Sequence, residues 1–165
     1  MTVRIDDPEA RVQHARDLAW RALNRRERTV AEMARILAAK RVEPATIDAV
    51  VSELREQGYL DDESYARRFA EDRRRLDTWG AERIERKLVS LGVDRNLIAA
   101  AIGEQGREDE MGAALALLAR RFPQAPETPR DRDRALGMLV RKGYELELAY
   151  DALRRHAGVA GEPLD

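Results

Sequence analysis

Three acidic residues in the segment REQGYLDDESYA (55–66) are the first candidates for chemistry, because neighbouring carboxyl groups can act as general acid and general base. They are Asp61, Asp62 and Glu63. Acid–base catalysis also requires a pocket and a carboxyl group with a raised pKa, and the surrounding sequence indicates neither. The sequence therefore favours a structural role for these acids.

The residues around the acids fit the end of one helix and the start of the next. Gly58 can take the left-handed conformation that closes a helix, and Tyr59 then packs back on that helix. Asp61 is placed to cap the next helix. Asp62 and Glu63 fall in its first turn, where the helix dipole stabilises negative charge.

Eight basic residues on the next two predicted helices form a candidate binding surface for a protein or for phosphates. Carboxylates lie among them at helical spacings, so a solvated surface with ion pairs is the alternative interpretation. The candidates are Arg67, Arg68, Arg73, Arg74, Arg75, Arg83, Arg86 and Lys87.

Asp72 has an unusual predicted position on the first of these two helices. Its helical angle places it within the apolar stripe formed by Tyr65, Phe69 and Leu76. A buried aspartate needs a cationic partner, so the sequence predicts an ion pair with Arg68 or with an arginine of the following helix.

The remaining reactive residue types give weaker signals. The two histidines, His14 and His156, lie near opposite ends of the sequence without ligand spacing, so we expect no metal site. No phosphate-binding loop and no context for a nucleophilic serine occurs, so we expect neither a cofactor nor an enzymatic activity. Trp79, beside Gly80 in a basic neighbourhood, could stack on bases, although tryptophan is more often part of a core.

Composition restricts the class of protein. The chain has 165 residues, of which 44% are hydrophobic, and carries 30 basic and 31 acidic side chains. A net charge of −1 excludes a generally basic, nucleic-acid-binding surface. The absence of cysteine, of an apolar N-terminal segment and of a long apolar stretch predicts a cytoplasmic protein with no membrane partner.

An internal repeat of 51 residues organises the sequence. Three segments align without gaps and place Leu37, Leu88 and Leu139 at one apolar position. The segments are MARILAAKRVEPATIDAVV (33–51), IERKLVSLGVDRNLIAAAI (84–102) and ALGMLVRKGYELELAYDAL (135–153).

Each repeated segment has the pattern of two helices and follows a further amphipathic helix. The additional helices are expected at about residues 10–27, 62–77 and 108–122. The inner face of the first of them is predicted to contain Leu18, Ala22 and Leu23. These patterns predict an all-α fold of nine helices in three tandem three-helix repeats, with frayed ends at residues 1–8 and 158–165. The predicted repeats cover residues 9–60, 61–105 and 106–157.

The repeat is imperfect at one turn. Gly92 and Gly143 have Arg41 as their counterpart, so the first repeat must either close its helix differently or hold an arginine at positive φ. At the other end of that helix, TVAE (29–32) fits a capping box formed by Thr29 and Glu32.

The segments GYLDDESYA (58–66) and WGAERIERKLVSLGV (79–93), together with the three-helix repeats, resemble the RecX family of bacterial regulatory proteins. The resemblance covers roughly residues 14–156. It implies an elongated, curved protein without enzymatic activity that binds the RecA recombinase filament on single-stranded DNA. It further implies inhibition or modulation of RecA ATP hydrolysis, strand exchange and coprotease activity in DNA repair and the SOS response. We expect a monomer, with RecA and DNA phosphates as the partners of the basic candidates.

Two other classes of protein remain as alternatives. A helix-turn-helix DNA-binding regulator would also have three helices per unit, but the third helices here are acidic or neutral where base and phosphate contacts need basic residues. A helical-repeat scaffold for protein interactions would fit the near-zero net charge.

Overall fold

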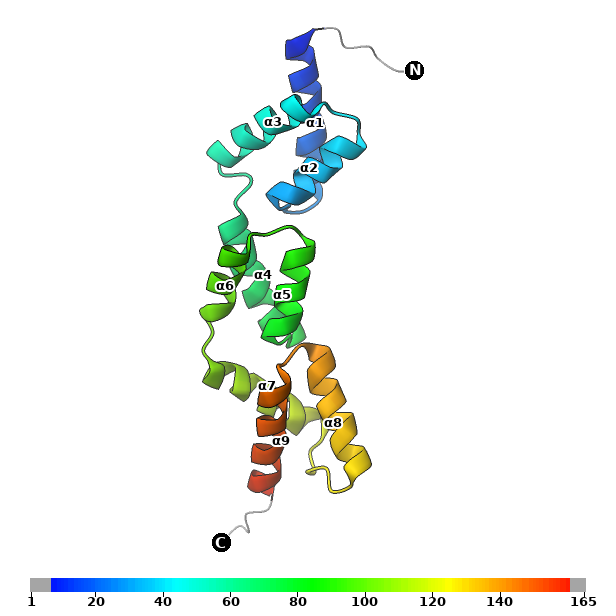
Figure 1. Ribbon diagram of the computed structural model, residues 1–165, viewed down its shortest axis with the longest axis vertical. Coiled ribbons are helices and arrows are strands. Elements are labelled where there is room, and N and C mark those ends of the chain that lie inside the picture. Colours follow the sequence, from blue (N-terminus) through cyan, green and yellow to red (C-terminus); the bar gives the residue numbers. More distant parts are fainter. Residues whose placement is uncertain (1–6, 161–165) are drawn as a thin grey trace. The chain divides into compact units, whose positions relative to one another are not determined.

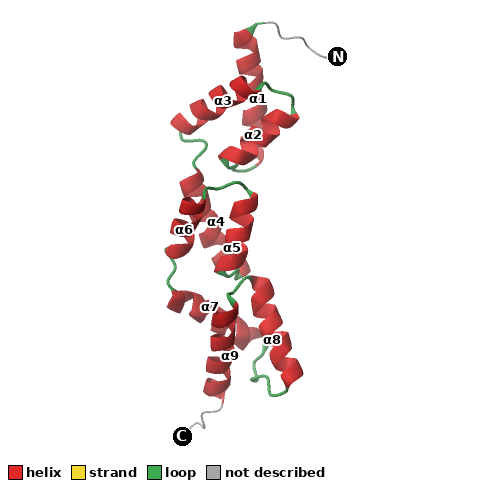
Figure 2. Cartoon of the chain, in the orientation of Figure 1, coloured by secondary structure: helices red, strands yellow, loops and turns green. Residues whose placement is uncertain are grey.

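The computed structural model describes residues 7–160, and the helices there account for all of the regular secondary structure (Figures 1 and 2). The prediction of an all-α protein with nine helices is confirmed for this part of the chain. The helices are α1 (Pro8–Arg25), α2 (Val30–Ala39), α3 (Pro44–Glu56), α4 (Asp62–Asp77), α5 (Ala81–Ser90), α6 (Arg95–Gly103), α7 (Arg107–Arg121), α8 (Pro129–Lys142) and α9 (Leu146–Ala160).

We call α1–α3, α4–α6 and α7–α9 triplets 1, 2 and 3. Their third helices begin at Pro44, Arg95 and Leu146, so each starts 51 residues after the one before. Leu37, Leu88 and Leu139 are each 0% exposed, which confirms the predicted burial of this repeated position. The 51-residue sequence period is therefore also a period of third-helix starts and of this buried leucine.

By its internal contacts the chain divides into two compact units, which are described separately. Unit 1 contains the described residues up to Ala66 together with Val89–Leu97. Unit 2 contains Arg67–Leu88 and the described residues from Ile98 onward. The division falls inside α4, α5 and α6, while the domain limits 9–60, 61–105 and 106–157 remain a prediction.

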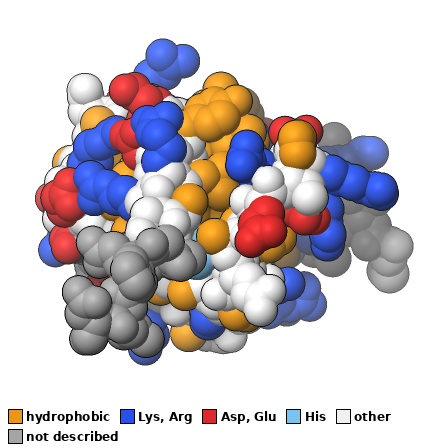
Figure 3. All heavy atoms as spheres, turned by 90° about the horizontal axis from the view of Figure 1, so that it is seen from below, with side chains coloured by type: hydrophobic (Ala, Val, Ile, Leu, Met, Phe, Trp, Pro, Cys, Tyr) orange, Lys and Arg blue, Asp and Glu red, His pale blue; other side chains and the backbone are white. Residues whose placement is uncertain are grey.

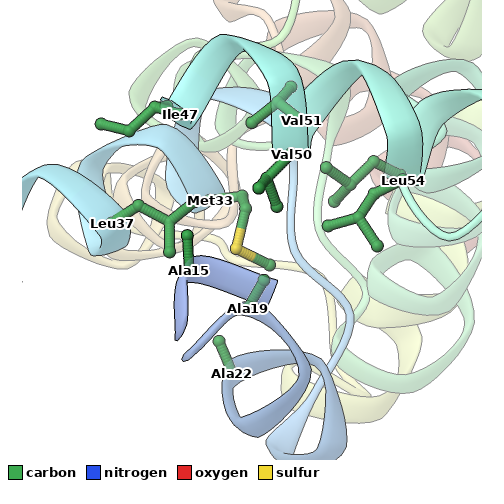
Figure 4. Close-up of a cluster of buried hydrophobic side chains, with 10 residues drawn as sticks. Ala15, Ala19, Ala22, Met33, Leu37, Ile47, Val50, Val51 and Leu54 are labelled. Atoms are coloured by element: carbon green, nitrogen blue, oxygen red, sulfur yellow. The ribbon is translucent and has the colours of Figure 1, made fainter. Parts of the chain in front are cut away.

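The core of unit 1 lies among α1, α2 and α3, which pack against one another pairwise. Figure 4 shows the alanines of α1 facing Met33 and Leu37 of α2 and the aliphatic side chains of α3. Of the predicted inner face of α1, Ala22 is buried, whereas Leu18 and Leu23 are only partly buried. The small side chains at positions 15, 19 and 22 let the helices approach closely, and the leucines fill the flanks.

The core of unit 2 is formed largely by α7, α8 and α9, with α9 packed against both of the others. Leu118 is fully buried, while Leu115 and Phe122 pack at the edge of the core. Tyr144, in the turn before α9, is its largest fully buried side chain. This turn also takes part in the contacts described below.

The inner face predicted for α4 is confirmed only in part, because Tyr65 and Phe69 are half-buried but Leu76 is not. Ala66 and Ala70 are its buried residues, while Leu76 is 61% exposed. Asp72 lies outside the core with half of its side chain exposed, so its predicted burial is wrong, and Arg75 is an ion-pair partner at 3.6 Å. The stripe of large side chains misled the prediction because close packing here uses alanines instead.

The ends of the described chain are more helical than predicted. α1 begins at Pro8, with Asp7 as its N-cap, and α9 continues to Ala160. The predicted fraying is therefore wrong for residues 8 and 158–160, and its remaining parts, 1–6 and 161–165, lie outside the described residues. Among the helices of residues 7–160, none has the length and apolar character needed to span a membrane.

Candidate functional site

The acidic segment at 61–63 is a helix start. Asp61 accepts hydrogen bonds from the Ser64 amide at 3.1 Å and from the Ser64 hydroxyl at 3.0 Å, which confirms the predicted cap of α4. Asp62 makes a contact that was not predicted, because its Oδ1 accepts from the Val30 amide of α2 at 2.9 Å. These acids serve structural roles between and within helices.

The turn before α4 also has the predicted form. Gly58 has φ of +81°, and the Tyr59 amide donates to the Leu54 carbonyl at 2.9 Å. The Tyr59 ring meets Trp20 edge to face, with 4.6 Å between ring centroids. The tyrosine is nevertheless 53% exposed, so it covers the core edge and faces solvent.

The start of α2 contacts triplet 2 at a place that we call the first joint. Thr29 and Glu32 form the predicted capping box. The Thr29 hydroxyl also donates to the Leu91 carbonyl at 2.6 Å. Gly92 has φ of +79°, and a Cβ added there would lie 2.3 Å from the Cβ of Ala31. The glycine thus permits both the turn and the close approach to α2.

The start of α5 contacts triplet 3 in the same way, at the second joint. The Gly80 amide donates to the Lys142 carbonyl at 2.8 Å, and the Glu82 amide donates to the Gly143 carbonyl at 3.0 Å. A Cβ on Gly143 would lie 2.2 Å from the Cβ of Arg83. Thr29–Leu91 and Gly80–Lys142 have the same spacing along the chain, so the joint repeats at the 51-residue period.

Each joint contains a carboxylate at the start of a second helix. Asp62 accepts from the Val30 amide, and Glu110 accepts from the Ala81 amide at 2.9 Å. Both amides belong to the first residue of a helix, where no carbonyl within the helix can accept the hydrogen bond. Both acids lie near the start of the next triplet's first helix, so each joint pairs two helix starts through one hydrogen bond.

Tyr144 anchors the second joint from within the core. Its hydroxyl donates to the carbonyl of Thr78 at 3.0 Å, and burial raises the pKa of Tyr144 to about 12. Thr78 has φ of +57°, an unusual conformation for a β-branched residue. Lys142 supports the same loop, since its Nζ donates to the Asp77 carbonyl at 2.9 Å.

Glu32 is a nearly buried carboxylate, but its environment does not suit a general acid. Burial raises the pKa of Glu32, and the hydrogen bonds from Arg26 and the Thr29 amide together with the nearby Arg28 charge outweigh that effect. The net pKa is lowered, and the Arg26 ion pair measures 2.5 Å. Glu32 therefore stays ionised and connects the α1–α2 loop to α2.

Of the eight predicted basic candidates, the structure leaves five exposed. Arg67 lies 3.7 Å from Glu104 and Arg75 lies 3.6 Å from Asp72, and all four side chains are largely in solvent. Such exposed pairs contribute little to stability and can be exchanged for partner contacts. The five are Arg67, Arg68, Arg75, Arg86 and Lys87.

The other three candidates are held within the fold. Arg73 forms an ion pair with Asp77 and lies over two aromatic rings. Arg74 donates to the Ile102 carbonyl at 2.9 Å, and burial lowers the pKa of Arg74. Arg83 stacks 4.2 Å from the Trp79 ring centroid. Their positions on the helices fit a structural role.

A groove of about 410 Å³ in unit 2 brings three of the candidates together with carboxylates. Trp79, between Arg83 and Phe69, forms part of its wall. The mixture of both charges and an aromatic wall suits a protein surface better than a row of phosphates. The lining residues are Arg67, Glu71, Arg74, Arg75, Trp79, Glu104, Gln105, Asp109, Glu110, Ala113 and Tyr144.

The fold and these contacts define a class: an all-α protein in which consecutive helix triplets are connected by a recurring joint. Comparison with family models matches residues 15–54 to the first three-helix domain of RecX and residues 61–102 to the second. The chain is 32% identical over 136 residues to regulatory protein RecX of Leptothrix cholodnii, with 82% of this chain and 85% of that protein covered. The chain belongs to the RecX family.

Other members of the family align with a larger part of this chain. Regulatory protein RecX of Thermobifida fusca is 28% identical over 160 residues, covering 96% of this chain and 86% of that protein. Among solved structures, RecX from Lactobacillus salivarius superposes with a TM-score of 0.79 at 16% identity, covering 90% of this chain and 97% of that one. This structural likeness extends the shared fold beyond the two matched domains.

Proposed function

We propose that this chain is a regulator of the RecA recombinase that binds the RecA filament on single-stranded DNA. It lowers ATP hydrolysis, strand exchange and coprotease activity by binding, in the cytoplasm, without a cofactor and without an activity of its own. The observation that carries the proposal is membership in the RecX family, whose curated relatives are named regulatory proteins.

The exposed basic residues of α4 and α5 supply the contact surface in this proposal. Arg67 and Arg75 line the mixed-charge groove, and Arg86 is exposed on α5. Carboxylates such as Glu71 and Glu104 line the same groove, so its charges complement a protein partner that also carries both signs. Direct contact with DNA phosphates would add a strong salt dependence.

The basic test is RecA ATP hydrolysis on single-stranded DNA with this protein titrated in. Inhibition that saturates with concentration is expected. An unchanged rate at an excess of the protein over RecA would contradict the proposed function.

The surface is tested by the triple charge reversal Arg67→Glu, Arg75→Glu and Arg86→Glu. Arg74 is left intact because its bond to the Ile102 carbonyl belongs to the fold. Loss of three favourable rim charges should raise the inhibitory concentration by about tenfold or more, with helicity unchanged. The matched control reverses three exposed arginines elsewhere in unit 2, Arg121, Arg130 and Arg134.

A salt series separates charge complementarity from other effects. Because salt screens exposed charges, the difference between the wild type and the triple variant should narrow as ionic strength rises. Equal inhibition by both proteins at low salt would show that these bases are only a solvated face. Equal losses in the variant and its control would show a general charge effect.

A further inference from the structure

At each joint the next triplet contacts the start of the second helix, α2 or α5. Triplet 3 has the equivalent surface on α8. Ala31 of α2 meets Gly92, and Glu82 of α5 bonds Gly143. The residue at the same repeat position in α8 is Asp133. It lines a groove of about 350 Å³, the α8–α9 groove, formed by Pro126, Arg132, Asp133, Leu136, Tyr150, Leu153, Arg154 and Ala157.

Two positions of the α8–α9 groove carry larger apolar side chains than the same positions of the other triplets. Tyr150 is 46% exposed, and it replaces Asp48 and Ala99 of the earlier repeats. Leu136 is half-buried, at the position of Ala34 and Glu85. Figure 3 views the molecule from below and shows hydrophobic side chains exposed there beside basic and acidic ones. An exposed apolar patch with a charged rim is typical of an interaction site.

We propose that the α8–α9 groove binds an α-helix of another protein that has a carboxylate in its first turn and an apolar face. The two joints provide the reason, because the carboxylates that meet the equivalent positions are Asp62 and Glu110, near the starts of α4 and α7. The groove therefore has the place in the repeat that an incoming acidic helix start occupies elsewhere in this chain.

The α8–α9 groove offers guanidinium groups, rather than a backbone amide, as donors to a carboxylate of the partner. At the first two joints the acid bonds a free helix-start amide, but α8 begins earlier, and the Arg132 amide donates to the Thr128 carbonyl at 3.0 Å. Arg132 is the residue at that repeat position, and its exposed side chain lines the groove, as does that of Arg154. Arg132 donates to the Glu127 carbonyl and Arg154 donates to Asp151. A guanidinium has five N–H donors, so both arginines keep further donors for a carboxylate.

A second copy of this chain does not fit as the occupant. At both joints the incoming triplet presents a glycine, and a side chain there would collide with the receiving helix. Triplet 1 has Arg41 at that position, with φ of +62°. Its side chain would keep triplet 1 of another copy from the same approach, which leaves a helix from a different protein.

The test uses the ¹⁵N-labelled full chain and a synthetic helix with the sequence of residues 107–122, stapled to hold its conformation. This probe carries three acids in its first turn and an apolar face. Amide shifts should change most at Leu136, Tyr150 and Leu153. Shifts centred on any other surface, or no shifts at millimolar probe, would overturn the proposal.

Variants make the test specific. Tyr150→Ser should weaken binding by about tenfold, as expected for an aromatic anchor, while Tyr59→Ser, at a similarly exposed tyrosine of unit 1, should leave it unchanged. A probe with its three first-turn acids replaced by amides should also bind more weakly. Equal affinity of the acidic and neutral probes, or a concentration-dependent dimer in sedimentation, would contradict the assigned partner. The assay contains no RecA, so its outcome is independent of the proposed function.

Discussion

Replacing Gly143 with alanine should destabilise unit 2 far more than the same replacement at Gly58 destabilises unit 1. Both glycines have positive φ, +97° and +81°. They differ in surroundings, because a Cβ on Gly58 meets nothing within 4 Å, whereas one on Gly143 would lie 2.2 Å from Arg83 Cβ and 2.6 Å from the Arg83 nitrogen. Comparing the two substitutions therefore separates the cost of the backbone conformation from the cost of disrupting the second joint.

The magnitude of the loss in unfolding free energy follows from three contributions. Holding alanine in the left-handed region costs about 1 kcal/mol at either site. At Gly143 the forced separation adds about 1–3 kcal/mol of overpacking. It also weakens the bonds Gly80–Lys142 and Glu82–Gly143, at about 1 kcal/mol each. We therefore expect a loss of about 4–6 kcal/mol for Gly143→Ala against about 1 kcal/mol for Gly58→Ala.

Urea unfolding followed by tryptophan fluorescence measures this difference. Gly143→Ala is made in a Trp20→Phe parent, so that Trp79, next to Gly80, reports unit 2. Gly58→Ala is made in a Trp79→Phe parent, so that Trp20 reports unit 1. Circular dichroism gives the helicity of each variant before unfolding. Free energies of unfolding reduced equally by the two substitutions would show that the turn conformation alone requires glycine, and that the joint contributes nothing.

Two further predictions concern polar groups at the joints. The pKa of Tyr144 is raised to about 12 in the folded protein, so unfolded chains lose the hydroxyl proton near pH 10 while folded chains keep it. The free energy of unfolding should therefore fall as the pH rises from 10 through 12. Urea midpoints across that range should fall less steeply in Tyr144→Phe, and parallel curves would contradict the assignment. Asp62→Ala leaves the Val30 amide without its acceptor and should cost about 1–3 kcal/mol, whereas Asp62→Asn keeps an acceptor oxygen and should cost less. Identical melting curves for the two Asp62 variants would show that the bond is unimportant.

Most of the fold could be predicted because the repeat and the helix ends have local causes. The capping box at Thr29 and the cap at Asp61 depend on residues within one turn of each other, and the structure contains both. The positive φ of Gly92 and Gly143 follows equally from the glycines themselves. The face of α4 could not be predicted in this way, since choosing Ala70 over Leu76 for the interior depends on how closely other helices approach.

The candidate surface could be predicted only as a region. Charge and helical spacing identified the eight bases but could not separate Arg74, which bonds the Ile102 carbonyl, from Arg75, which faces solvent one residue later. That difference depends on contacts between residues 28 positions apart in sequence. The sequence did carry a signal for the joints, because glycines at 92 and 143 recur at the 51-residue period, but it could not show which helix they approach.

Arg41 shows why the glycine recurs in two triplets and is absent from one. All three residues at this position have positive φ, +62° for Arg41, +79° for Gly92 and +97° for Gly143. The turn that ends the second helix of a triplet therefore does not require glycine. An arginine can adopt the positive φ at a conformational cost of about 1 kcal/mol. The requirement comes from the approach of Gly92 to Ala31 and of Gly143 to Arg83, where no Cβ fits. In triplet 1 the same turn is exposed, so its side chain is free to be large and charged. The glycines therefore mark where one triplet packs against another, rather than where a helix ends.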